Sequence, residues 1–397
     1  MNDETNIRAL TNGVNQKGVR DHNERLILTL LQRHGDLPGS EIARRTRLSA
    51  QTVSVILRKL EGDGLVRKGE PVRGKVGKPF VPIALDPNGA FAFGIKVGRR
   101  SSEVFLTDLR GNILFKSHLN YTIALPDQVF AFIQKALRDA QATLSDADVG
   151  RICGIGIAAP FEIWKWSDYA GPVPAEFLSW RDLSMADEVA RLTNLPVFVM
   201  NDATSACWAE HVYGRGREFS DYVYFFVSTF VGGGVVLDQT VYEGGRGNAG
   251  ALGPLRVGDR NGQTKQLLDV ASIRVLEQTL ADSGHDPKAL WAVPQDWSAF
   301  DGYVEDWLDN TANAIAQACI SACAVIDFEA VIIDGYVPQD VRATLVEKVR
   351  KRLPQEDSRG LILPEVFEGG IGGEARALGA ACSPFFAQFF LGKKPTV

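Results

Sequence analysis

The stretch from Leu37 to Gly64, LPGSEIARRTRLSAQTVSVILRKLEGDG, determines how the first part of the chain folds. We expect one helix with Ser40 as its N-cap and a second that opens at Ser49, whose hydroxyl can accept a hydrogen bond from the amide of Thr52. Apolar residues recur in the second helix at i, i+3, i+4 and i+7, which indicates one buried face formed by Val53, Ile56, Leu57 and Leu60. The pattern predicts two short helices joined by a turn at 45–48, a helix-turn-helix.

The opposite face of the second helix carries small or hydrogen-bonding side chains: Ala50, Gln51, Ser54, Val55 and Arg58. Such a face can enter the major groove of DNA, but short helix pairs also occur in all-α domains, where the same face is only solvated. The neighbouring sequence favours DNA, because an amphipathic helix is expected at 21–35 and two short strands follow, around a basic, glycine-rich loop that would form a wing.

We therefore predict a winged helix-turn-helix over residues 21–87, after a polar arm at 1–20. The side chains expected to contact DNA are Ser49, Gln51, Thr52, Ser54 and Arg58 in the helix and Arg73, Lys75 and Lys78 in the wing. Gln51 is suited to adenine, whereas the wing cations would reach phosphates or an adjacent minor groove.

Charge is unevenly distributed along the 397 residues. The first 85 residues hold 15 Lys and Arg against 9 Asp and Glu, and the remainder holds 28 against 39. A basic module thus precedes an acidic body, which argues against nucleic acid wrapping the whole chain.

No apolar run reaches the length of a membrane span, and the cysteines lack a spacing typical of secreted proteins, so we expect a cytoplasmic protein with no membrane partner. Cys319 and Cys323 lie one helical turn apart and would supply half a metal site, but no other His or Cys lies close by in sequence, so we expect them to be core residues.

The sequence pattern over residues 88–397 predicts two copies of the same arrangement of strands and helices. In the first copy we expect strands at 91–97, 103–108 and 113–121, a helix at 126–144, a strand at 152–158, a helix at 183–193, a strand at 196–200 and a helix at 203–213. In the second we expect strands at 222–228, 233–237 and 241–242, helices at 265–283 and 297–326, a strand at 330–333, and helices at 339–353 and 373–390. The duplication implies two α/β lobes with a cleft between them for a small ligand.

Two segments of this body are candidates for ligand contact. Glycines 232–234 join two strands and would let backbone amides approach an anion, although a glycine run in a hairpin is as often only a tight turn. Asn201-Asp202 follows a strand end, where Asp202 can act as a general base toward a hydroxyl, accept a hydrogen bond from one, or cap the helix that starts at Ala203.

An ordered set of motifs resembles the ROK family. The motifs are GIKVGRRSSEVFLTDLRGNIL at 94–114, GIGIAAP at 154–160, VFVMNDATSACWAE at 197–210, STFVGGGVVLDQTVYEGGRGNAGALGPL at 228–255 and LGAA at 378–381. That family joins sugar kinases of the actin-like ATPase fold with sugar-responsive repressors that add an N-terminal winged helix. The resemblance implies an α/β chain with a two-lobed actin-like body over 88–397 that senses a ligand and forms oligomers.

The chain departs from the family's kinases at three positions that bear on ATP. Lys96 stands where the first phosphate loop has an Asp, Phe230 precedes the glycines of the second phosphate loop, and Tyr336 follows Gly335 where the adenosine loop has paired glycines. A cation cannot assist Mg²⁺ as a carboxylate does. Asp202 aligns with the family's catalytic base, but the resemblance with these departures implies a protein that is no enzyme and has neither catalytic residues nor a cofactor.

The sugar and zinc motifs of the family are also altered. Its Gly-Glu-x-Gly-His reads GALGP at 250–254, and no cysteine lies between Cys207 and Cys319, so we expect no zinc. Four aromatic residues, Trp164, Trp166, Tyr169 and Trp180, would offer a stacking surface for a sugar ring or simply belong to the core. The ligand-binding residues we predict are Asn201, Asp202, Glu210, Trp180 and Gly233.

Together these features predict a transcriptional regulator, a repressor of carbohydrate-related genes, whose body binds a sugar or sugar derivative without phosphorylating it. Its expected partners are double-stranded DNA with a pseudo-palindromic operator, a carbohydrate effector and further copies of itself in a homodimer or homotetramer. Two alternatives remain, namely control by a protein partner instead of a small ligand and, less favoured, an active sugar kinase.

Overall fold

The computed structural model describes residues 16–71, 80–160, 162–166 and 173–392. The chain divides into two compact units, the first comprising residues 1–89 with 389–391 and the second residues 90–388 with 392–397. The wing cations Arg73, Lys75 and Lys78, and the aromatic residue Tyr169, lie outside the described residues. Within the described part of the chain, no helix is both long and apolar enough to cross a bilayer.

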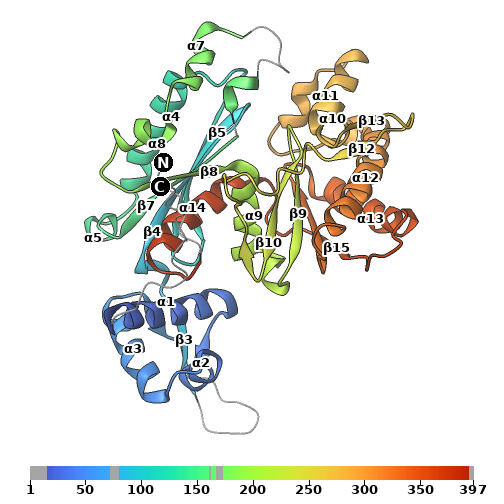
Figure 1. Ribbon diagram of the computed structural model, residues 1–397. Helices are drawn as coiled ribbons and strands as arrows, with labels where there is room; N and C mark the ends of the chain where they lie inside the picture. The colour runs from blue at the N-terminus through green and yellow to red at the C-terminus, as the bar shows by residue number, and fades with distance from the viewer. Residues whose placement is uncertain (1–15, 72–79, 161, 167–172, 393–397) are drawn as a thin grey trace, which may run out of the picture. The chain divides into compact units, whose positions relative to one another are not determined.

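The first unit packs three helices against a small antiparallel sheet (Figure 1). The helices are α1 (Gln16–His34), α2 (Gly39–Thr46) and α3 (Ala50–Gly62), and the strands, in sheet order, are β1 (Leu37–Pro38), β3 (Pro82–Leu85) and β2 (Val66–Lys68). Its core is formed by apolar side chains from all three helices, including Ile27, Leu31, Ile42, Val53, Ile56 and Leu60. Residues 389–391 belong to this unit, where Nε of Arg25 donates a hydrogen bond to the carbonyl of Phe390 at 2.9 Å.

The helix-turn-helix prediction is confirmed, with one error in its first cap. Ser49 caps α3 and its Oγ accepts from the amide of Thr52 at 3.0 Å, as expected. Ser40 does not cap α2, because that helix already begins at Gly39 and its cap position is the extended Pro38, which makes no side-chain hydrogen bond. The strand β1 was not predicted, since two residues are too few to form a recognisable alternation.

The first lobe of the second unit contains a five-stranded sheet of order β6-β5-β4-β7-β8. These strands are β6 (Ile113–Asn120), β5 (Ser101–Asp108), β4 (Phe91–Val97), β7 (Ile152–Ala159) and β8 (Val197–Asn201). The helices are α4 (Pro126–Gln141), α5 (Asp146–Val149), α7 (Ala175–Leu178) and α8 (Met185–Ala190). Val129 and Ile133 of α4 share a buried cluster with Phe93 and Ile95 of β4, so α4 covers one face of this sheet.

The second lobe repeats the arrangement, with a sheet of order β11-β10-β9-β14-β15. Its strands are β11 (Thr240–Val241), β10 (Gly232–Leu237), β9 (Tyr222–Val227), β14 (Ala330–Gly335) and β15 (Glu365–Glu368), and β12 (Arg256–Gly258) pairs with β13 (Thr264–Gln266) as a separate ribbon. In both sheets three antiparallel strands are followed by two parallel ones, which confirms the predicted duplication.

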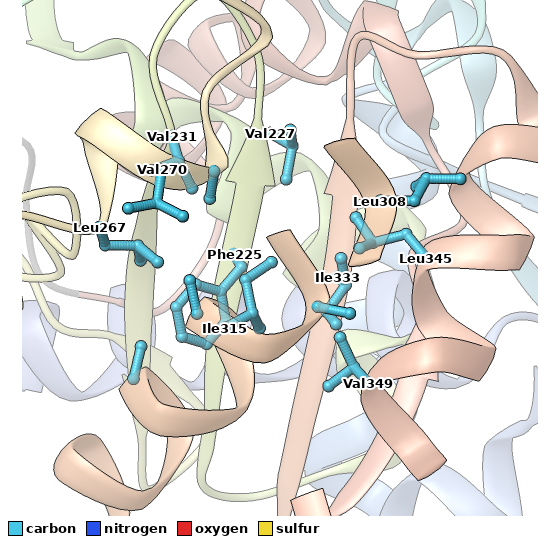
Figure 2. Close-up of a cluster of buried hydrophobic side chains, with 14 of the residues drawn as sticks. Phe225, Val227, Val231, Leu267, Val270, Leu308, Ile315, Ile333, Leu345 and Val349 are labelled. Atoms are coloured by element: carbon cyan, nitrogen blue, oxygen red, sulfur yellow. The ribbon is translucent and has the colours of Figure 1, made fainter. Parts of the chain in front are cut away.

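The core of the second lobe lies between its sheet and the helices α10 (Leu268–Ala271), α11 (Ile273–Asp282), α12 (Asp301–Cys323) and α13 (Gln339–Arg352). Figure 2 shows Ile333 of β14 beside Leu345 and Val349 of α13. Cys319 and Cys323 are buried in the same cluster, so their assignment to the core is confirmed.

The predicted helix at 265–283 is wrong. Residues 264–266 form β13, and the rest divides into α10 and α11 at Ser272, whose backbone is extended with φ −77° and ψ 149°. Ser272 is held there by long-range hydrogen bonds, because its Oγ accepts from the amide of Val231 at 3.0 Å and its carbonyl accepts from Nε1 of Trp307 at 3.1 Å. Hydrogen bonds between residues so far apart in sequence do not alter the local pattern of apolar residues, so this pattern could not predict the break at Ser272.

Two helices, α9 (Asp202–Tyr213) and α14 (Ala375–Gln388), pack against each other and against the sheets (Figure 1). A Cβ on Gly379 of α14 would lie 1.7 Å from the carbonyl oxygen of Ser205 on α9. Likewise, a Cβ on Gly94 or Gly156 of the first sheet would lie 2.0 or 1.8 Å from a carbonyl oxygen of α14. Glycine at these positions permits direct backbone contact, so α14 covers the face of the first sheet opposite α4.

Candidate functional site

The outer face of α3 presents its polar side chains to solvent. Val53, Ile56 and Leu60 are buried, whereas Gln51, Ser54 and Arg58 are exposed. The hydroxyls of Ser49 and Thr52 lie 2.8 Å apart and hydrogen-bond to each other, so these two residues fix the start of the helix. The exposed side chains therefore share one face of a capped helix, the arrangement that reading base edges requires.

A cavity of about 360 Å³ in the second unit, here called the Asp202 cavity, is lined by two of the five predicted ligand residues. Asn201 and Asp202 line it from the carboxyl end of β8, and Ala251, Gly253 and Pro254 line it from the altered GALGP segment. Its lining also includes Phe230, which the sequence analysis singled out, and polar side chains that it did not: Arg99, Glu162, Lys165, Asn248 and Gln266.

Asn201 and Asp202 have different roles in this cavity. The side chain of Asn201 caps α9, since its Oδ1 accepts from the amides of Ala203 at 2.9 Å and Thr204 at 3.3 Å. The cap that we considered for Asp202 is therefore supplied by its neighbour. The carboxylate of Asp202 instead lies 3.8 Å from Nη1 of Arg376, and its side chain is 17% exposed.

Trp180 lies at a second cavity of about 710 Å³, which Trp164 and Asn201 also line. Its side chain is buried, its Nε1 donates to the carbonyl of Ala124 at 2.7 Å, and its ring lies 5.5 Å from that of Phe130. The structure thus gives Trp180 core contacts together with a place in a cavity wall.

Gly233 and Glu210 lie outside the lining of both cavities. Gly233 is paired with Phe225 inside the sheet, and a Cβ there would lie 2.0 Å from the carbonyl oxygen of Tyr224. Glu210 is buried on α9, where its carboxylate accepts from the amides of Arg215 at 2.8 Å and Gly370 at 2.9 Å. Burial, aided by the charge of Asp334, raises the pKa of Glu210 to about 7.

Lys96 forms a buried polar cluster within the first sheet. Its Nζ donates to Oγ of Ser101 at 2.5 Å and lies 3.3 Å from Oε1 of Glu103, which in turn faces Nδ1 of His118 at 3.6 Å. Burial lowers the pKa of Lys96, which the charge of Glu103 partly offsets. The pKa of Glu103 is lowered by Lys96 and His118, although burial alone would raise it.

Arg376, at the start of α14, is a further residue near the site that sequence reasoning missed. The residue is 7% exposed, its Nη1 faces Asp202, and its guanidinium lies over the rings of Phe226 and Tyr336 at 5.3 and 6.0 Å. The sequence does contain a pattern that could have identified Arg376. It is the single charged residue in the apolar run ARALGAACSPFF, and a charged side chain buried in such a run needs an oppositely charged or hydrogen-bonding partner.

Known proteins resemble the chain along most of its length. Residues 92–382 match the sequence pattern described as "ROK family", and residues 20–67 match one described as "Winged helix-turn-helix DNA-binding". The chain is 28% identical over 371 residues to the uncharacterized protein y4fQ of Sinorhizobium fredii, covering 93% of this chain and 92% of that protein. It is 26% identical over 247 residues to the xylose repressor of Bacillus spizizenii, covering 62% of this chain and 63% of that repressor.

Among solved structures, a ROK family transcriptional regulator described as a homolog of the E. coli MLC protein aligns with a TM-score of 0.64 and 21% identity. The alignment covers 91% of this chain and 95% of that regulator, and at this identity it supports the fold. The match to the family covers well over half of the chain. The chain therefore belongs to the ROK family, with a winged helix-turn-helix ahead of an actin-like body of the sugar-kinase type.

Proposed function

We propose that the protein is a transcriptional repressor of carbohydrate-related genes, whose body binds a sugar or sugar derivative as its effector and does not phosphorylate it. The family supports the general role, since a xylose repressor is among the relatives of the chain. Ligand binding would change the affinity for DNA because the ligand prefers one arrangement of the lobes.

The observation that carries the DNA-binding half of the proposal is the exposed polar face of the capped helix α3. In this proposal Gln51, Ser54 and Arg58 reach base edges in the major groove, and the wing cations bind phosphates. A homodimer or homotetramer presents two such helices, so the operator is a pseudo-palindrome.

The polar cluster around Lys96 supports binding without phosphoryl transfer. Kinases hold Mg²⁺ through carboxylates and use it to neutralise the transferred phosphate. Here the position that is Asp in the family's kinases is Lys96, and the nearest carboxylate, that of Glu103, already pairs with this lysine. Asp202 then serves as a hydrogen-bond acceptor for a ligand hydroxyl.

Selection of bound sequences from random DNA by the purified protein, repeated across a panel of sugars and sugar phosphates, tests the proposal. We expect a palindrome whose occupancy one compound alters, and no consumption of ATP with that compound. A palindrome indifferent to every compound would favour control by a protein partner. ATP turnover that disappears in Asp202→Ala would establish a kinase, and the absence of any enriched sequence would refute the DNA-binding half.

A further inference from the structure

The second unit contains another cavity, of about 370 Å³, whose charged lining residues are all cations. We call it the Arg376 cavity; it is lined by Lys96, Arg99, Arg100, Ser101, Asn120, Tyr121, Thr122, Thr229, Lys288, Trp291, Ala292, Tyr336 and Arg376. Five of these residues are lysine or arginine. Carboxylates outside the lining pair with two of them, Glu103 with Lys96 and Glu277 with Arg100, whereas among the carboxylates that the structure describes Arg376 has only a 3.8 Å contact with Asp202. A concave surface lined by one sign of charge concentrates ions of the opposite sign.

Arg376 contributes a donor that the protein itself leaves unused. Its side chain is 9% exposed, and among the residues that the structure describes its Nε has no hydrogen-bond partner. Its one carboxylate contact, with Asp202, is 3.8 Å long, which is beyond hydrogen-bond distance. Buried polar groups without partners are rare and costly, and a guanidinium fork suits a planar or tetrahedral anion with several oxygens.

Lys96 and Ser101 line the same cavity, beside Tyr121. The Nζ of Lys96 has donors to spare, because an ammonium has three and the structure assigns two, to Ser101 and Glu103. Trp291 and Tyr336, whose rings stack with centroids 5.6 Å apart, also line the cavity, and Arg100 and Arg376 lie over these rings at 5.4 and 6.0 Å. The cavity thus combines buried cationic donors with an aromatic wall.

The Arg376 cavity adjoins the Asp202 cavity. Arg99 lines both, and the contact between Asp202 and Arg376 joins a residue of one lining to a residue of the other. The guanidinium of Arg376 therefore lies 3.8 Å from the carboxylate to which we assign a ligand hydroxyl.

We propose that the Arg376 cavity binds the anionic group of the effector, a phosphate or carboxylate, through Arg376 and Lys96, so that the effector is an anionic carbohydrate and not a neutral sugar. This inference rests on the proposed function in one respect, that the ligand of the body is a small effector. Anion binding itself is independent of DNA binding and can be measured without DNA.

Titration calorimetry of the full-length protein tests the inference, with orthophosphate, pyrophosphate, gluconate, glucose 6-phosphate and glucose as probes. We expect the anions to bind, and glucose 6-phosphate to bind more tightly than both glucose and orthophosphate. Tighter binding of glucose 6-phosphate than of orthophosphate distinguishes a phosphorylated sugar from free phosphate as the source of the group.

Variants assign the binding to this cavity. Arg376→Gln should weaken anion binding roughly 10- to 100-fold, the effect of losing hydrogen bonds to a charged group, and Arg376→Lys should restore part of it. Because Arg376 is buried, Lys288→Ala provides a second test at an exposed residue, with a smaller loss expected. Lys135→Ala, an exposed lysine on α4 that pairs with Asp139, is the matched control and should change nothing.

Two outcomes would overturn the inference: no probe anion binds the wild-type protein, or Arg376→Gln and Lys288→Ala, both folded by circular dichroism, bind anions as the wild type does. Either result leaves the proposed function standing if the protein still selects a palindrome from random DNA. Conversely, anion binding without any selected DNA sequence would refute the proposed function alone.

Discussion

Replacing Glu210 by Gln separates two roles for this residue, the ligand contact that its sequence motif predicts and the structural role that its contacts support. Its carboxylate accepts hydrogen bonds from the amides of Arg215, which begins the 3-10 helix after α9, and of Gly370, which is 160 residues away in sequence. Burial and the charge of Asp334 raise its pKa from 4.5 to about 7. The native protein therefore holds a proton on Glu210 at pH values where the unfolded chain has released it.

The pKa shift of Glu210 sets the size and sign of the expected effect. A carboxyl group whose pKa is raised on folding favours the native state most at low pH, and this contribution is lost as pH rises from 4.5 to about 7. A shift of this size corresponds to about 3 kcal/mol in the free energy of unfolding. Glu210→Gln stays neutral at all pH values, so its stability relative to the wild type should rise by about that amount across the window.

Replacing one oxygen by an NH₂ group also brings a donor toward the Gly370 amide, which costs about 1 kcal/mol. That cost does not depend on pH. The test is therefore how the difference in the free energy of unfolding between wild type and Glu210→Gln changes with pH. Urea unfolding at several values between about pH 4.5 and 8 measures this difference, and contributions from titrating groups that do not interact with Glu210 cancel in it. The matched control is Glu218→Gln, at an exposed residue shortly after α9. It should leave the pH dependence of the free energy of unfolding unchanged between about pH 4.5 and 8.

Parallel stability curves for wild type and Glu210→Gln would show that the carboxylate is already ionised in the native state and would refute the reasoning. The ligand role makes a different prediction. If Glu210 contacts the effector, Glu210→Gln should weaken effector binding at every pH, whereas a residue that only joins the Arg215 and Gly370 segments should leave that affinity unchanged.

Four further changes test the recognition helix and the helix packing. Ser49→Ala should lower the free energy of unfolding by about 1 kcal/mol, and Ser49→Asp should retain the cap, both measured by urea unfolding. Gln51→Ala should relax preference at one base by roughly 1–3 kcal/mol in competition binding, whereas Lys75→Ala should weaken binding to all sequences and lower the salt slope by about one; equal effects on specificity would contradict the assignment of helix and wing. Gly379→Ala should cost roughly 1–3 kcal/mol or more, because its Cβ would meet a carbonyl oxygen of α9 at 1.7 Å, while Gly302→Ala, with open space around its Cβ, should cost nothing.

The sequence predicts best those elements whose own residues determine their burial. The strand at 91–97 was predicted to the residue, because every side chain from Phe91 to Val97 is buried and a turn follows at Gly98. The cap at Ser49 was also predictable, since donor and acceptor lie three residues apart. The break at Ser272 was not, because the amide that its hydroxyl binds belongs to Val231 in another part of the lobe.

The same distinction applies to the candidate site. Asp202 was identifiable because it follows a strand within a local motif, and the structure places it in a cavity wall. Arg376 lies on a helix at the far end of the chain, so its approach to Asp202 depends on how α14 packs. From the sequence, Lys96 could be recognised only as a replacement for the Asp of the family's kinases. The structure shows in addition that it lines the same cavity as Arg376.

The packing of α9 and α14 links the two adjoining cavities mechanically. Asp202 is the first residue of α9 and lines one cavity, while Arg376 lies in the first turn of α14 and lines the other. Between these helices, Gly379 allows direct contact with the backbone of Ser205, and Oγ of Ser205 donates to the carbonyl of Arg376 at 2.6 Å. Because close-packed interiors transmit small shifts, a displacement of one helix start is expected to reach the other. An anionic sugar that spans both cavities would therefore act on the α9–α14 pair as a whole, whereas a neutral sugar confined to the Asp202 cavity would contact only the start of α9.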